Sequence, residues 1–111
     1  MASGKVEGLK RIELYKESGR EASLDVCGNV VALNLVNVYL SQIPVIPEAY
    51  RPIGAGSDSR YDAPIQTYSN GGTEPRVAVL HIDHSTGAVS AWNIHTLLNG
   101  TVTWLRKIPS S

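Results

Sequence analysis

The chain has 111 residues, of which 42% are apolar, and its ten basic residues balance ten acidic ones. This length and apolar content fit one globular domain with a modest core. Nucleic acid and anionic membranes are disfavoured as partners, because both need a clustered positive surface and the charges here are scattered. The single cysteine, Cys27, excludes an internal disulfide.

The first part of the chain predicts antiparallel strands joined by tight turns. Residues 11–15 fit a half-buried strand or a short helical turn, and residues 21–26 alternate apolar and polar side chains as a strand does. The strongest strand is predicted over 30–40. Its apolar face changes phase near Leu35 and Val36, which indicates a β-bulge or a strand buried on both faces.

A stiff apolar segment, IPVIPEAYRPIG, follows at residues 43–54. Proline cannot donate to a sheet ladder, so this segment is predicted to cross the fold rather than to join the sheet. Its apolar side chains are expected to pack over an open end of the core; they are Ile43, Val45, Ile46 and Ile53.

The second part of the chain predicts further short strands. In order, we expect a polar loop over 54–62, an edge-like strand over 64–68, a loop over 69–75, a strand over 76–83, a turn over 84–87, a strand over 88–98, an Asn99-Gly100 hairpin turn and a strand over 101–105. The strand over 76–83 is apolar on both faces, like that over 30–40. Their extra apolar faces are expected to lie under a loop or against another copy of the chain.

Together these elements predict an all-β fold, an antiparallel β-sandwich or jelly-roll-like barrel, with residues 1–111 as a single domain. Residues 1–10 are interpreted as a flexible lead or a stalk remnant, and residues 107–111 as a tail. No cofactor is predicted, since Gly54-Ala55-Gly56 lacks the flanking strand and helix of a dinucleotide fingerprint.

Polar side chains gather in two places that could bind a ligand. His81, Asp83 and His84 form H-x-D-H, and His95 lies on the strand expected to pair back. These are metal-ligand types, but the spacing matches no metal motif. One alternative is a purely structural role, in which the strand end is solvated and Asp83 caps the turn. Another is a polar binding patch. No local signature supports a catalytic nucleophile.

Aromatic residues add a weaker indication of saccharide binding. Tyr61 lies in the predicted polar loop between Arg60 and Asp62, where a ring could stack on a sugar while the charged groups bind hydroxyls. Trp92 and Trp104 alternate with apolar neighbours, so a core or interface position is the stronger expectation for both.

The middle of the chain resembles the terminal domains of bacteriophage tail fibres and receptor-binding proteins. The resemblance rests on the strand GNVVALNLVNVYL, the crossing IPEAYRPIG and the strand and turn RVAVLHIDHSTGAV, and spans residues 28–89. It implies a homotrimeric β-sandwich head in the virion tail, made in the bacterial cytoplasm, that binds a host cell-surface saccharide, as in phages of Gram-positive bacteria.

We therefore expect a non-catalytic recognition module, with host glycan, further copies of itself and other tail or baseplate proteins as partners. The saccharide-binding residues, our own inference, are Arg60, Tyr61, Asp62, His81, Asp83, His84 and Trp92. The alternatives are a structural virion protein, such as a head-fibre, decoration or baseplate component, a small metal-dependent hydrolase, and a cellular lectin-like domain that shares the fold.

The crossing is expected to have mainly a structural role. We predict that the ring of Tyr50 packs inward and that the Arg51 guanidinium binds neighbouring backbone carbonyls or a carboxylate. Prolines in such a segment reduce the entropy lost on folding. The functional alternative is that Tyr50 and Arg51 contact the receptor.

Overall fold

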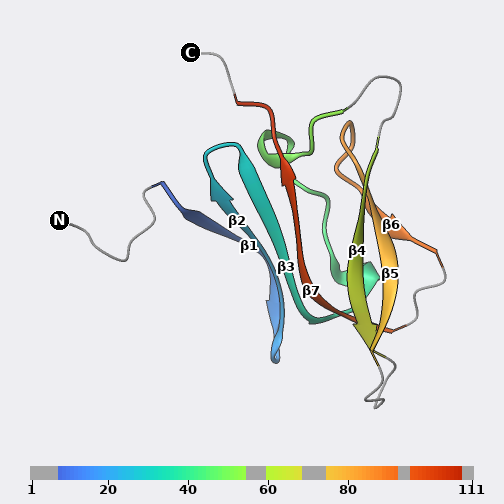
Figure 1. Ribbon diagram of the computed structural model, residues 1–111. Helices are drawn as coiled ribbons and strands as arrows, with labels where there is room; N and C mark the ends of the chain where they lie inside the picture. Colours follow the sequence, from blue (N-terminus) through green and yellow to red (C-terminus); the bar gives the residue numbers. More distant parts are fainter. Residues whose placement is uncertain (1–7, 55–59, 69–74, 93–95, 109–111) are drawn as a thin grey trace.

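The computed structural model describes residues 8–54, 60–68, 75–92 and 96–108 of the chain. The strands are β1 (Lys10–Glu17), β2 (Arg20–Cys27), β3 (Val30–Val38), β4 (Arg60–Tyr68), β5 (Pro75–Asp83), β6 (Val89–Ala91) and β7 (Leu97–Leu105). They form one antiparallel sheet in the order β1-β2-β3-β7-β4-β5-β6, which curls into a half-barrel (Figure 1). The prediction of an all-β antiparallel fold is confirmed. Most of the predicted lead and tail lies outside the described residues.

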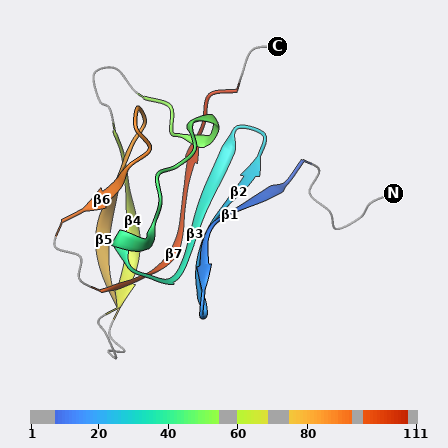
Figure 2. The same ribbon diagram turned by 180° about the vertical axis from the view of Figure 1, so that it is seen from behind.

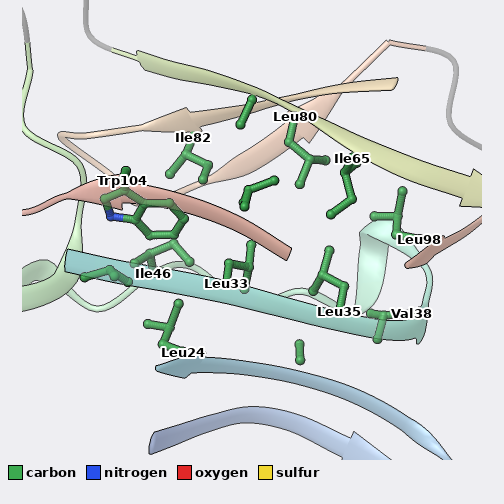
Figure 3. Close-up of a cluster of buried hydrophobic side chains, with 14 of the residues drawn as sticks. Leu24, Leu33, Leu35, Val38, Ile46, Ile65, Leu80, Ile82, Leu98 and Trp104 are labelled. Carbon is green, nitrogen blue, oxygen red and sulfur yellow. The ribbon is translucent and has the colours of Figure 1, made fainter. Parts of the chain in front are cut away.

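The core fills the concave side of this sheet. Leu24 and Leu33 point into it from one end of the sheet, and Leu80 and Ile82 point into it from the other (Figure 3). Trp104 on the central strand β7 is almost fully buried between them, as expected, and its indole Nε1 donates a hydrogen bond to the Tyr50 carbonyl at 2.8 Å. The curl therefore brings strands that are far apart in sheet order around one apolar interior.

The crossing segment, residues 43–54, covers the open side of the half-barrel. It continues from η1 (Leu40–Gln42), contains η2 (Glu48–Tyr50) and runs in front of the central strands in Figure 2. Ile46 is fully buried and Ile43 packs against the core, whereas Val45 and Ile53 are exposed. The predicted packing of the crossing is confirmed for two of its four apolar residues.

Strand β3 contains the predicted bulge. Its register with β7 shifts between Leu35 and Val38, and Asn37 takes a positive φ of 51°. Leu35 and Val38 are buried, while Val36 is exposed. The bulge thus explains the phase change, and β3 buries only one face.

Two predictions for residues 88–100 are wrong. Residues 88–98 do not form one strand, because β6 ends at Ala91 and β7 begins at Leu97. Asn99 and Gly100 are not a hairpin turn; they lie inside β7, where Asn99 pairs with Gln66 of β4 and Gly100 with Leu35 of β3. Gly100, with a φ of +130°, lies where β7 meets the bulge of β3 and where its pairing with β4 ends.

Strand β4 also begins earlier than predicted, since residues 60–62 belong to it rather than to a loop. In sheet order β4 lies between β7 and β5, so it is not an edge strand. Proline has no backbone N–H to donate to a neighbouring strand. Pro64 is accommodated because β4 pairs with β7 only at Gln66–Tyr68, so at Pro64 the strand is paired only with β5.

The convex face differs between the two ends of the sheet. Across β1, β2 and β3, Arg11 binds Asp25 through two hydrogen bonds of 2.6 and 2.7 Å, and Asn34 donates to the same carboxylate. At the other end, Val77 of β5 is 72% exposed and Val79 is 43% exposed. The second apolar face of β5 is therefore open to solvent in the single chain. No helix among the described residues has the length and apolar character needed to span a membrane.

Candidate functional site

The candidate site lies on the convex face where β4, β5 and β6 run side by side. Ala63 and Leu80 point into the core, so their neighbours Asp62 and His81 point outward. The register places Asp62 opposite His81, and His81 opposite Ser90. Three polar residues from three strands thus form one row across the sheet.

A short hydrogen bond joins the first two members of this row. His81 Nδ1 donates to Asp62 Oδ1 at 2.7 Å. Arg60, two residues before Asp62 on the same face, brings its Nε to 3.4 Å from the same oxygen. The hydrogen bond from His81, followed by the charges of His81 and Arg60, holds the pKa of Asp62 below its usual value. Asp62 is therefore a carboxylate over the physiological pH range and accepts hydrogen bonds.

Trp92 stands beside this row at the end of β6. Its ring meets that of His81 edge to face, with centroids 6.4 Å apart and planes at 89°. Trp92 is 76% exposed, so it is neither a core residue nor covered within the described chain. The sequence favoured a core or interface position for Trp92, and the structure rules out the core position. We call Arg60, Asp62, His81 and Trp92 the outer cluster.

The other nitrogen of His81 is unusual. Within the described residues, His81 Nε2 stands out as a buried side-chain polar atom with no hydrogen-bond partner. The side chain as a whole is 14% exposed. Buried polar atoms in folded proteins are nearly always paired, so Nε2 is the position of the ring that is still open to a partner.

The row of Asp62, His81 and Ser90 contains the residue types of a nucleophilic triad. That mechanism needs the serine hydroxyl hydrogen-bonded to the imidazole base. Because His81 Nε2 has no partner, Ser90 Oγ is not held against it.

Tyr61 lies on the opposite face of β4 from the outer cluster. Its hydroxyl donates to the Thr103 carbonyl, and its ring packs against that of Trp104 with centroids 6.0 Å apart. The sequence placed Tyr61 in a polar loop because the start of β4 was not recognised. In the structure it anchors β4 to the core, which removes it from the candidate site.

Asp83 lies opposite Arg60 across the β4–β5 pair, but its carboxylate and the His84 ring both have partners outside the outer cluster. Asp83 Oδ1 accepts hydrogen bonds from the backbone N–H groups of Ser85 at 2.7 Å and Thr86 at 3.0 Å, which confirms the predicted cap. These bonds hold the pKa of Asp83 below its usual value. The His84 ring instead packs on Gly54, where an added Cβ would lie 2.6 Å from its Cε1.

The H-x-D-H residues therefore do not converge on a common point. In the part of the chain that the structure describes, no three His, Cys, Asp or Glu side chains gather in a way that could hold a metal ion. His95 lies outside the described residues.

Sequence reasoning missed Ser90, the third member of the row. The turn over 84–87 gave a usable signal, since counting back along both strands from that turn pairs His81 with Ser90. The contact between Asp62 and His81 had no such signal, because the connection between β4 and β5 could be placed in several registers.

A comparison of the chain with protein-family models, with curated proteins and with solved structures found no match.

Proposed function

We propose that the chain is a non-catalytic recognition module whose outer cluster binds a host cell-surface saccharide, as the receptor-binding head of a phage tail fibre. The observation that carries this proposal is the position of Trp92. An exposed indole beside a fixed carboxylate and imidazole offers an apolar surface for a sugar ring and polar groups for its hydroxyls. Sites of this kind combine aromatic surface with a few placed polar groups.

The unpaired His81 Nε2 supports the same proposal. Asp62 holds the imidazole through Nδ1, which leaves Nε2 as the free position of the ring. Trp92 meets the imidazole edge to face and is largely exposed, so its indole is also available to a ligand beside this ring. A ligand hydroxyl that reaches Nε2 then provides the missing partner, and binding gains the free energy of a buried hydrogen bond.

The sandwich or jelly-roll-like closure, the homotrimer and the location in the virion tail belong to this proposal. Val77 and Val79 on the same convex face support self-association, because exposed apolar strips of this kind mark interaction surfaces. Val77 lies four residues before His81, about 13 Å along the strand. A contact at Val77 would leave the outer cluster open near the subunit boundary, and several copies would strengthen weak single-site binding.

The test measures binding of purified cell-wall polysaccharide from Gram-positive bacteria to the wild-type chain and to folded variants, by calorimetry. Trp92→Ala is expected to weaken binding at least about tenfold, as truncation of a central tryptophan does at other interfaces. Asp62→Asn should also weaken it, because the imidazole loses its orienting charge. Val36→Ala is the matched control, because Val36 is exposed on β3, away from both the outer cluster and Val77. Full binding by both cluster variants would overturn the proposed site.

The exposed strip at Val77 and Val79 also favours a second candidate, a structural virion protein whose partner is another virion protein. The two proposals differ in one measurable respect. A structural component oligomerises or binds its partner without affinity for cell-wall polysaccharide, whereas the recognition module binds polysaccharide through Trp92.

A further inference from the structure

At one end of the half-barrel, the crossing meets the β5–β6 turn and the end of β7 (Figure 2). An open hollow of about 770 Å³ is present there, a size that accommodates a small ligand. The residues that line it include Glu48, Arg51, Ile53, Gly54, His84 and Lys107. We call it the crossing hollow.

The Arg51 guanidinium is fixed in this hollow by neutral partners. Its Nε donates to the Ile46 carbonyl at 2.8 Å, and its Nη1 donates to the Ser85 carbonyl. Carbonyl oxygens orient the group but do not neutralise its charge. Among the ion pairs of the described residues, none includes Arg51. A fixed guanidinium with uncompensated charge binds an anion without further loss of side-chain entropy.

The other charges around the hollow add to this positive potential. Lys107 is exposed at its rim and forms no ion pair in the described part of the chain. Among the described residues, Glu48 is the carboxylate that lines the hollow, and the Asp83 carboxylate accepts hydrogen bonds from the turn backbone nearby. Arg106 lies behind the wall, with its Nη1 donating to the Ala49 carbonyl at 3.1 Å. Among the described residues that line the hollow, Arg51 and Lys107 outnumber Glu48.

The hollow also has an apolar wall. Ile53 is 52% exposed and faces solvent at its edge. The His84 ring lies directly on Gly54, where an added Cβ would come within 2.7 Å of the ring atom Cδ2. Gly54 thus makes room for the imidazole, which forms one side of the hollow. An apolar side and a fixed cation together suit an anionic group attached to a carbon ring.

We propose that the crossing hollow binds a carboxylate or phosphate group carried by the saccharide, with Arg51 and Lys107 as the anion contacts and Ile53 against the attached ring. This inference rests on the proposed function and adds the chemical class of the ligand, an acidic saccharide. The hollow and the outer cluster are close along the chain, because His84 follows the cluster residue His81 by three positions and Arg60 pairs with Asp83.

The experiment follows backbone amide and indole resonances of the full chain by NMR at low ionic strength, where charge interactions are least screened. The probes are inorganic phosphate, D-glucuronate and uncharged D-glucose. We expect glucuronate and phosphate to shift the amides of Gly54, His84 and Lys107, and glucose not to do so. Glucuronate should also shift the indole N–H of Trp92.

Lys107→Ala is expected to weaken glucuronate binding about two- to fivefold, as loss of one exposed charge contact does. Lys10→Ala is the matched control, since Lys10 lies on β1 at the opposite edge of the sheet and its loss changes the net charge equally. Equal weakening by both variants, or no shift at the hollow, would overturn the site.

The remaining outcomes separate this inference from the proposed function. If phosphate shifts the amides of the hollow but no saccharide shifts the Trp92 indole, the hollow binds anions. The inference that a saccharide carries the anion would then be wrong. Shifts at Trp92 that are equal for glucose and glucuronate, without a response at the hollow, would support the proposed function and overturn the acidic ligand.

Discussion

The backbone N–H of Ile46 donates a hydrogen bond to the Gly87 carbonyl at 2.7 Å, and this bond fastens the crossing to the β5–β6 turn. Arg51 strengthens the junction, because its guanidinium binds carbonyls of both segments, at Ile46 and at Ser85. Tyr50 packs against the core beside it. The structural roles predicted for Tyr50 and Arg51 are confirmed. The crossing and the turn, which the sequence marks out as separate motifs, form one junction.

Replacement of Gly87 by alanine should undock this junction. Gly87 has a φ of +77°, and a Cβ there would lie 2.6 Å from Arg51 Nε and closer still to the Ile46 carbonyl oxygen. Gly19→Ala is the matched control, because Gly19 has a φ of +80° but nothing within 4 Å of the added Cβ. We expect about 1–2 kcal/mol of lost stability for the control, from the left-handed backbone alone. Gly87→Ala should cost about 1–3 kcal/mol more, from the broken hydrogen bonds.

Chemical denaturation of the two glycine variants measures this difference directly. Equal losses of unfolding free energy would show that the junction between the crossing and the turn does not stabilise the fold.

The two tryptophans should differ sharply in their contribution to stability. Trp104 is 4% exposed, packs against Tyr61 and donates to the Tyr50 carbonyl, whereas Trp92 is 76% exposed. Trp104→Ala should cost about 3–5 kcal/mol, as truncation of a large core residue does. Trp92→Ala should change the unfolding free energy by no more than about 0.5 kcal/mol. Thermal and urea unfolding would check both values, and a large loss for Trp92→Ala would contradict its surface position.

Much of the fold could be predicted from local patterns, because most strands bury one face and their side chains alternate. The bulge in β3 is an example, since the phase change at Leu35 and Val36 is visible in the sequence itself. The roles of Asp83 and Arg51 were also predictable. An aspartate at a turn and an arginine in a proline-rich crossing each have few local groups to bind.

The site was less predictable, because it depends on contacts between strands that are far apart in sequence. Tyr61 and Asp62 are neighbours, yet they face opposite sides of β4, and only the start of that strand decides which one is exposed. Asn99-Gly100 gave a strong hairpin signal, but at this point β7 continues as a strand that pairs with both β4 and β3. That tertiary requirement overrides the local turn preference.

The stability of the chain should fall at acidic pH partly through Asp25. Its hydrogen bonds from Arg11 hold the pKa of Asp25 below its ordinary value of 3.8. The carboxylate therefore stabilises the folded state fully above that value, and this contribution is lost as the pH falls through the lowered pKa. Unfolding free energies measured between about pH 6 and pH 2 should decrease less steeply for Asp25→Asn than for the wild type. Glu13→Gln, which carries the same charge change on β1, is the control. Parallel curves for the wild type and Asp25→Asn would refute the linkage.

Self-association through the convex face gives the last prediction. If Val77 and Val79 form the contact between copies, the wild-type chain should have three times its monomer mass in solution. Val77→Lys should reduce that mass to one chain, because a buried interface does not tolerate an unpaired charge. Its intrinsic cost to the strand is no more than about 1 kcal/mol, so the variant should fold. Val45→Lys is the control, since Val45 is 57% exposed on the crossing rather than on β5. Light scattering behind a sizing column measures all three masses. A monomeric wild type, or equal dissociation by both variants, would rule out the convex face of β5 as the contact between copies.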